Sequence, residues 1–310
     1  MAYKPELLAT AASLEELEKL MAAGADAFVI GEARYGMRLA GEFNVELIAE
    51  AVKLAKPKGV RIYAALNNLM DNDTADSLGP YIASLHHIGV DAIVFGDPAV
   101  LMAAKVHAPG MALHWNAEMT STNYVTANYW GRRGATRYVL ARELNMEQVV
   151  DTTAGTELEL QVQVHGMTNI YHSKRSLVDS YMEHQSDSER LPVKDKERGL
   201  YVIETERQDE RYPIYEDANG THIMSSDDIC MIENLHELME AGIHSLKIEG
   251  IMKSMAYNET VIRAYRQAID AYVADPASYV FQEEWLESIQ AVQDSNRELS
   301  YGFFYKEQVY

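Results

Sequence analysis

Short apolar segments alternate along the chain with longer segments in which apolar residues recur at helical spacing. In LEELEKLMAAGADAFVIGE (14–32), a stretch with helical spacing precedes Gly24, and the apolar run AFVI follows it. The same order of helix, glycine and apolar run recurs four more times, with glycines at Gly59, Gly89, Gly134 and Gly242. Glycine ends a helix in the left-handed backbone region without steric cost. The pattern therefore predicts a series of helix–strand units.

Eight of the apolar segments are predicted to be strands. They are 5–10, 26–31, 61–66, 92–96, 112–117, 137–141, 158–164 and 245–250. Apolar runs of this length between amphipathic helices are typical of parallel strands that are buried on both faces. Eight β/α units in about 250 residues predict a closed TIM-type (β/α)8 barrel. The alternative is an open doubly wound sheet, but no Gly-x-Gly-x-x-Gly turn follows the first strand.

One segment, 183–224, interrupts this rhythm and is predicted to be an insertion between strands seven and eight. It is polar as far as Arg198, and GLYVIETE and RYPIYED then alternate as the two strands of a β-hairpin would. Two helices, SMAYNETVIRAYRQAIDAYV and WLESIQAVQDSN, are predicted after the last strand. We therefore expect a single barrel domain over 1–310. Its parts are a core at 1–182 and 225–272, the insertion at 183–224, and a C-terminal helical and aromatic tail at 273–310.

The composition restricts the class of protein. With 310 residues, of which 47% are hydrophobic and 24% charged, the chain can bury a sizeable core. Its single cysteine, Cys230, rules out an internal disulfide and a four-cysteine metal site on this chain alone. Cys230 is expected to be buried at the start of a helix. We find no signal-peptide pattern and no apolar run of membrane-spanning length, so we expect a cytoplasmic protein with no membrane partner.

The net charge argues against an extensive RNA-binding surface. Acidic residues outnumber basic ones by 47 to 27, which gives a formal charge of −20. Proteins that bind nucleic acid usually neutralise phosphates with lysine and arginine. Any RNA contact would therefore need a local basic patch or a partner chain.

In a TIM barrel the functional site lies where the carboxyl ends of the strands meet the following loops. The polar residues at these positions are our candidates for ligand binding: Tyr35, Arg38, Asn67, Asn116, Arg142, Lys247 and Glu249, with Lys174 and Arg175 in the polar segment after strand seven. Arginine binds a carboxylate or phosphate through two parallel hydrogen bonds. The candidates for acid–base chemistry are His165, Glu143 and Glu118.

These residues also have structural interpretations, which stay open at this point. Arg142 and Glu143 could form an ion pair between loops, and Lys247 and Glu249 could fill the barrel interior as paired charges. His165 could be a hydrogen-bonded turn histidine. No tight spacing of metal ligands is present, so we predict no metal site. No Gly-x-Ser-x-Gly elbow is present either, which argues against a serine nucleophile.

Several segments resemble conserved motifs of one known family. The run VHGMTNIYHSKRSLVDSYM (164–182) resembles the signature of the peptidase U32, or collagenase-like protease, family. Further similar segments follow the family's order along nearly the whole chain: 24–43, 89–101, 139–149, 225–254 and the motif around SYGFFY (300–305). The resemblance implies a barrel-type core, which agrees with the strand count.

The resemblance also implies two kinds of activity and one cofactor. Family members were labelled proteases or collagenases, whereas others take part in hydroxylating tRNA wobble uridine, ribosomal RNA cytidine or a ubiquinone precursor. Cysteine-bearing members have four cysteines that look like iron–sulfur ligands. Two of these positions are Asn169 and Ser176 here, a third has no counterpart in 183–228, and only Cys230 is retained. We therefore expect this chain alone to bind no such cluster.

This departure makes the chain similar to a shorter, cysteine-poor subgroup from Gram-positive bacteria. There, a chain with a His-Gly-Met-Thr run accompanies a longer U32 paralogue in making 5-hydroxyuridine in tRNA. The resemblance thus implies a subunit of a prephenate-dependent tRNA hydroxylation system that contacts tRNA through a complex with that paralogue. Prephenate, or another small carboxylate, would bind at the barrel mouth to Arg38, Arg142 and Arg175. The alternatives are a U32-type peptidase and a non-catalytic scaffold for the paralogue.

Overall fold

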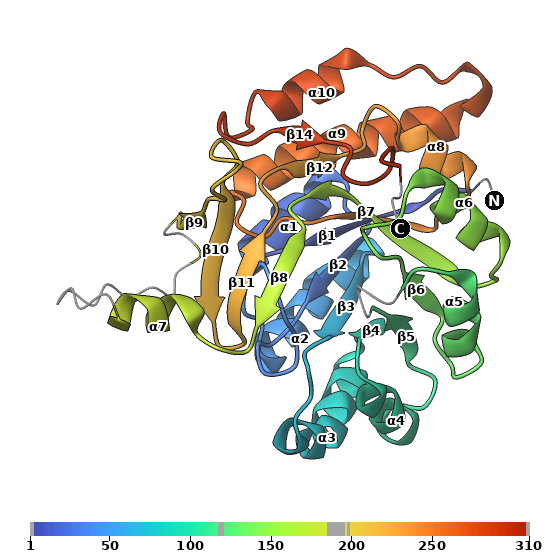
Figure 1. The fold of residues 1–310 in the computed structure, drawn as a ribbon. Helices are drawn as coiled ribbons and strands as arrows, with labels where there is room; N and C mark the ends of the chain where they lie inside the picture. Colours follow the sequence, from blue (N-terminus) through green and yellow to red (C-terminus); the bar gives the residue numbers. More distant parts are fainter. Residues whose placement is uncertain (1–2, 117–120, 185–195, 197–198, 308–310) are drawn as a thin grey trace.

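Eight parallel strands close into a barrel in the computed structural model of the chain, which describes residues 3–116, 121–184, 196 and 199–307 (Figure 1). The strands are β1 (Glu6–Thr10), β2 (Ala27–Ile30), β3 (Arg61–Leu66), β4 (Ala92–Phe95), β5 (Ala112–Trp115), β6 (Arg137–Val139), β7 (Glu159–Gly166) and β13 (Ser245–Ile248). They are hydrogen-bonded in this order, and β13 pairs with both β1 and β7, which closes the sheet. The predicted TIM-type barrel is confirmed, and each predicted strand overlaps an observed one.

Helices connect the strands and cover the outside of the barrel (Figure 1). They are α1 (Leu14–Ala23), α2 (Val45–Ala55), α3 (Asn72–Ile88), α4 (Pro98–His107), α5 (Tyr124–Gly131), α6 (Met146–Ala154), α8 (Leu235–Glu240) and α9 (Met255–Ala274), with short 3-10 turns at Lys56–Lys58 and Pro276–Ser278. The predicted helix ends at glycine are present at two of these positions. Gly24 and Gly89 end α1 and α3 in the left-handed backbone region. Within the described ranges, no helix has the length and apolarity needed to cross a lipid bilayer.

The barrel interior is apolar in the middle and charged at the amino-terminal ends of the strands. Its apolar middle is formed by Leu8, Ala27, Tyr63, Ala92 and Val94. Arg137, the first residue of β6, donates hydrogen bonds to Glu6 of β1 at 2.6 Å and to Glu159 of β7 at 2.7 Å. These paired charges fill the amino-terminal end of the barrel.

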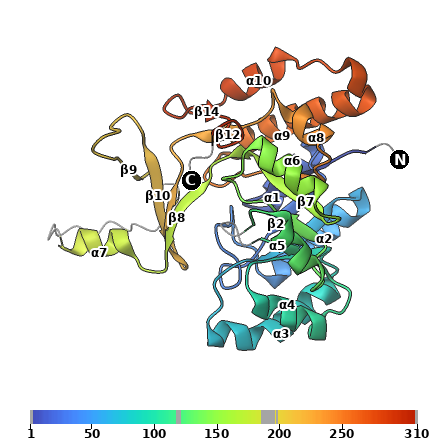
Figure 2. The ribbon, with the colours of Figure 1, turned by 45° about the vertical axis from the view of Figure 1, so that its right-hand side comes forward.

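A second, four-stranded sheet lies beside the barrel (Figures 1 and 2). Its order is β8 (Asn169–Ser173), β11 (Gly220–Met224), β10 (Tyr212–Asp217) and β9 (Tyr201–Val202), and neighbouring strands are antiparallel. Helix α7 (Leu177–His184) follows β8, and the buried Glu216 carboxylate accepts the backbone N–H groups of Val178 and Asp179 in its first turn.

The predicted hairpin accounts for only part of this sheet. The two predicted strands correspond to β9 and β10, whereas β8 and β11 were not expected. Strand β8 belongs to a polar run, and its partner β11 lies about fifty residues later in the chain, so no local alternation marks the pair. The second sheet therefore begins at Asn169, before the expected insertion at 183–224.

The edge of β7 is extended by two short strands. Strand β12 (Asp228–Cys230) pairs antiparallel with β7, and β14 (Leu299–Ser300) pairs with β12. The prediction that Cys230 begins a helix was wrong, because β7 continues past its neighbour β6 and offers an unpaired edge; Cys230 is nevertheless buried. Helix α10 (Glu283–Gln290) packs along α9, so the predicted C-terminal helices are confirmed (Figure 1).

Candidate functional site

A cavity opens at the carboxyl-terminal end of the barrel. Its charged lining residues are Arg38, Arg142, Lys247 and Glu249, and its amide residues are Asn67, Asn116, Gln161 and Asn169. The second sheet contributes Asn169 and Met224, so this sheet forms part of the cavity wall. Met37, Met167 and Ile251 add apolar surface. Six of the sequence candidates thus lie together: Arg38, Asn67, Asn116, Arg142, Lys247 and Glu249.

The lining is positively charged although the protein is strongly acidic. Three cationic side chains and one carboxylate line the cavity, in a chain with a formal charge of −20. A concave site of one sign, with low-dielectric walls, concentrates ions of the opposite sign. The cavity is therefore suited to an anion with an apolar body.

Glu249 is held in one position by contacts to both of its carboxylate oxygens. Lys247, two residues earlier on β13, donates to Oε2 at 2.7 Å. The Thr10 hydroxyl and the Ile251 backbone N–H both donate to Oε1, at 3.2 and 3.1 Å. The charge pairing foreseen as the structural interpretation is present, and it orients Lys247 at the cavity wall.

Arg142 is placed by a hydrogen bond to the backbone, and Arg38 by the conformation of its loop. Arg142 follows β6 and donates from Nη2 to the Asn169 carbonyl at 3.1 Å, which links the barrel to the second sheet. Arg38 lies in the loop after β2 with a φ of +54°. A non-glycine residue in this region costs about 1–3 kcal/mol, and such strain clusters at ligand sites. The preceding residue, Met37, donates its N–H to Asn67 Oδ1 at 3.0 Å, which holds the loop.

Other sequence candidates lie outside the cavity lining. Tyr35 is buried and stacks on Tyr81 at a centroid distance of 3.9 Å. Lys174, in the loop between β8 and α7, donates to the Leu69 carbonyl, and Arg175 beside it is exposed. Glu143 is exposed next to Arg142, and Glu118 lies outside the described residues. The roles expected for these side chains remain predictions.

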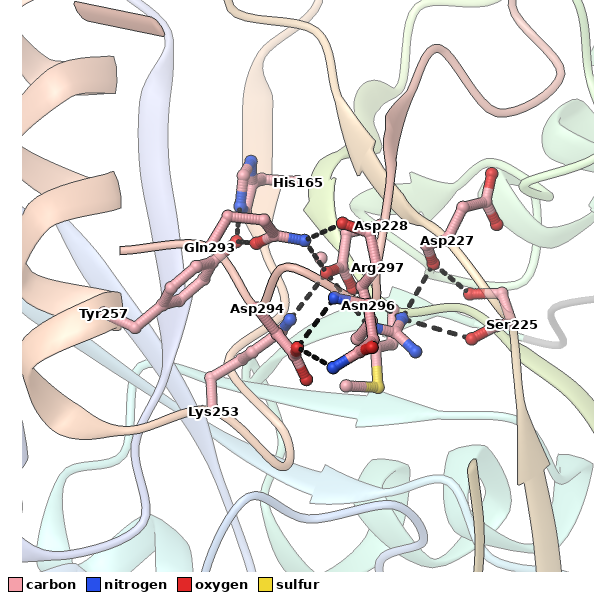
Figure 3. A network of polar contacts seen from close by, with 12 residues as sticks. His165, Ser225, Asp227, Asp228, Lys253, Tyr257, Gln293, Asp294, Asn296 and Arg297 are labelled. Carbon is pink, nitrogen blue, oxygen red and sulfur yellow. Dashed lines mark hydrogen bonds and ion pairs between the residues drawn. The ribbon is translucent and has the colours of Figure 1, made fainter. Parts of the chain in front are cut away.

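His165 lies in a buried polar network instead of in the cavity lining (Figure 3). It is fully buried, and its Nε2 lies 2.8 Å from the Tyr257 hydroxyl, which donates to Gln293 Oε1 at 2.7 Å. Burial lowers the pKa of His165 to about 3, so the ring is neutral at pH 7. This placement favours the structural interpretation of His165, because its ring is hydrogen-bonded within this network and is not among the residues that line the cavity.

Two amide side chains of the cavity lining were not among the sequence candidates. Gln161 lies on β7 and Asn169 begins β8, and both line the cavity. The signal for Gln161 was present, since LELQVQV places polar and apolar residues alternately along β7 and one set must face the interior. No local signal marks Asn169, because its contact with the barrel depends on the second sheet.

The comparison with known families identifies the chain's relatives. The sequence model of peptidase family U32 matches residues 12–309. The chain belongs to peptidase family U32. A solved U32 peptidase, Mk0906, has a TM-score of 0.51 with 16% identity over 80% of this chain and 94% of that one, which shows the shared fold.

Relatives of this U32 chain are named for RNA hydroxylation. "tRNA hydroxylation protein P2" of Bacillus subtilis is 50% identical over 99% of both chains. "tRNA hydroxylation protein P1" of the same organism is 34% identical over 99% of this chain and 74% of its own length. "tRNA hydroxylation protein P" of Escherichia coli is 28% identical over 97% of this chain and 74% of its own length.

The residues at the positions where the resemblance implies iron–sulfur ligands do not fit such a cluster. Asn169 and Ser176 offer an amide and a hydroxyl there, and clusters are held by thiolates. Cys230 is buried beside the Tyr265 hydroxyl, and burial raises the pKa of its thiol to about 11. Among the described residues, no group of three His, Cys, Asp or Glu is arranged to hold a metal ion.

Gly166 packs against the backbone of Glu249 in this U32 barrel, so an alanine should not be tolerated there. Its φ is +95°, and a Cβ atom would lie 2.1 Å from the Glu249 carbonyl oxygen. We expect Gly166→Ala to lower the free energy of unfolding by at least about 2 kcal/mol, measured by urea denaturation. Gly59→Ala is the matched control, because Gly59 has a φ of +70° with no atom within 4 Å. Gly59→Ala should lower the free energy of unfolding by about 1 kcal/mol. Equal losses in the two variants would contradict a clash at Gly166.

Proposed function

We propose that this chain is a subunit of a tRNA hydroxylation system that makes 5-hydroxyuridine at the wobble position. The observation that carries the proposal is the 50% identity to tRNA hydroxylation protein P2, which extends over 99% of both chains. The relatives P1 and P bear related names at lower identity. Since tRNA is the substrate, the protein works in the cytoplasm.

The cavity binds the small co-substrate of this reaction, and prephenate is our candidate. Prephenate is a cyclohexadiene with one carboxylate on the ring, a second in its pyruvyl side chain, and a ring hydroxyl. Arg38, Arg142 and Lys247 supply positive charge on the lining, and Met167 and Met224 supply apolar surface for the ring.

The RNA contact is shared with a partner chain, the longer U32 paralogue. A net charge of −20 repels RNA phosphates, so a more basic chain must supply much of the affinity. Tyr171 and Tyr181 are exposed on the second sheet and α7, which offers apolar surface for such a complex.

Of the two alternatives, a specific observation favours the scaffold. The replacement of cluster cysteines by Asn169 and Ser176 is what a chain that stabilises a catalytic paralogue would show. The peptidase alternative lacks a nucleophile of the cysteine type, because the Cys230 thiol is buried with a raised pKa.

Arg142→Ala tests the proposal against the scaffold. In a host strain that lacks the gene, we expect the wild-type gene to restore 5-hydroxyuridine in tRNA, measured by mass spectrometry of nucleosides. The Arg142→Ala variant should restore about 10- to 100-fold less, since a charge-assisted hydrogen bond to the ligand is lost.

The matched control is Arg133→Ala, which removes an exposed arginine that stacks on Tyr129 of α5. It should restore the modification fully. Circular dichroism and co-purification with the paralogue establish that both variants fold and assemble. Full restoration by Arg142→Ala would support the scaffold. An unchanged level of 5-hydroxyuridine in the deletion strain would contradict the tRNA assignment.

A further inference from the structure

Gln161 presents a hydrogen-bonding problem in the cavity. It lies on β7 with 3% of its surface exposed, and its Oε1 is buried without a hydrogen-bond partner among the described residues. A buried acceptor that stays unpaired costs about 1–3 kcal/mol, so most such groups are satisfied by protein or by bound molecules. Gln161 therefore calls for a donor that the described protein does not supply.

The neighbouring glutamine on the same strand shows a different arrangement. Gln163 is also buried, and its amide donates to the carbonyl oxygens of Gly166 and Met167 at 3.2 and 2.9 Å. Gln163 does not line the cavity, whereas Gln161 does. The unpaired acceptor thus belongs to the glutamine at the cavity. Asn169, also in the lining, has a buried Oδ1 without a partner as well.

We propose that the ligand of this cavity carries a hydroxyl or amine donor in addition to its carboxylates, and that Gln161 Oε1 accepts from it. The inference rests on the proposed function, because it concerns the same cavity and ligand. Arg38, Arg142 and Lys247 attract the carboxylates, and Gln161 selects among carboxylates of similar shape. Gln161 is therefore a specificity-determining residue.

The physical basis is the cost of an unpaired acceptor. Gln161 Oε1 is buried and has no hydrogen-bond partner among the described residues. A ligand that supplies a donor removes this cost, and an analogue without the donor leaves the acceptor unpaired. Sites built to hydrogen-bond a hydroxyl reject the analogue without it far better than apolar pockets reject small changes in size.

The test compares two ligands and two variants by isothermal titration calorimetry. The ligands are prephenate and an analogue in which hydrogen replaces the ring hydroxyl, with both carboxylates retained. The wild-type protein should bind prephenate at least about tenfold more tightly than the analogue. Gln161→Met, which keeps side-chain length and removes the polar atoms, should bind both with equal affinity.

A stability measurement separates this role from a merely structural one. Removing an unpaired buried acceptor should leave the thermal midpoint of Gln161→Met unchanged or higher, whereas loss of a structural hydrogen bond would lower it. Gln267→Leu, a change at an exposed residue of α9, is the control and should keep the wild-type preference.

Each remaining outcome overturns the inference in a different way. If Gln161→Met keeps the wild-type preference while Arg142→Ala loses both ligands, the proposed cavity stands and the role of Gln161 is overturned. If the wild-type protein binds neither ligand, the assignment of prephenate fails together with the inference. A lowered thermal midpoint in Gln161→Met would mean that its amide is structural.

Discussion

Replacing Asp228 with asparagine is expected to lower the free energy of unfolding by about 3–5 kcal/mol, the usual cost of breaking a buried ion group. The Asp228 side chain is fully buried between two cations (Figure 3). Lys253 Nζ lies 2.6 Å from one carboxylate oxygen, and Arg297 Nη2 lies 2.8 Å from the other. Asparagine would leave both cations buried without a compensating charge.

The loss should depend on pH in a defined direction. Burial alone would raise the pKa of Asp228, but the Arg297 hydrogen bonds and the Lys253 charge hold it far below its ordinary value. A carboxyl with a lowered pKa stabilises the fold above its unfolded pKa of about 3.9, and the contribution is lost as the pH falls toward the folded pKa. Asparagine does not titrate. The stability gap between the two proteins should therefore be constant near neutral pH and narrow below about pH 4.

Urea denaturation at a series of pH values checks both statements, and Asp227→Asn is the matched control. Asp227 is the preceding residue, and its half-buried carboxylate accepts from the Ser300 hydroxyl. Asp227→Asn should lower the free energy of unfolding by less than about 1.5 kcal/mol. Equal losses in the two variants, or a gap that widens in acid, would contradict a stabilising role of the buried charges.

Arg137 lies at the opposite end of the barrel. Arg137→Met is expected to lower the free energy of unfolding by a similar amount, about 3–5 kcal/mol. Arg137 is 2% exposed and holds Glu6, which is 4% exposed. Burial would raise the pKa of Glu6, but the charge and hydrogen bond of Arg137 keep it lowered. Without Arg137, the Glu6 carboxylate keeps Arg61 as its remaining cation, and that side chain is nearly half exposed.

A double-mutant cycle with Glu6→Gln separates the pair from its surroundings. The double variant should lose less stability than the sum of the two single variants, because no buried charge is then left unpaired. Ser245 and Tyr63 both donate to Glu6 and can still bond to glutamine. Additive losses, measured by urea denaturation at pH 7, would show that the two side chains act independently.

The barrel could be predicted from the sequence because its signals are local. Each unit carries its own helix periodicity, a glycine stop such as Gly24 or Gly89, and a short apolar run. Parallel strands buried on both faces occur in sheets covered by helices, and eight such units favour a closed barrel. The strand ends then locate the candidate site without further information. This explains why Arg38, Arg142 and Lys247 were found together.

The side chains that surround those cations could not be found in this way. Strand β8 becomes a strand only through β11, so Asn169 and Met224 reach the cavity through a pairing of distant segments. The roles considered for His165 also required the tertiary structure, because Tyr257 and Gln293, which come from distant segments, surround it.

The sequence by itself determined the barrel, its family and the polar ends of its strands, because the signals for them lie in residues that are neighbours in the chain. The tertiary structure decided which polar residues line the cavity and which belong to buried networks. Lys247 and Lys253 are six residues apart, yet the first lines the cavity and the second neutralises Asp228. A charge is stabilised by the groups that surround it in space, and local sequence does not specify them.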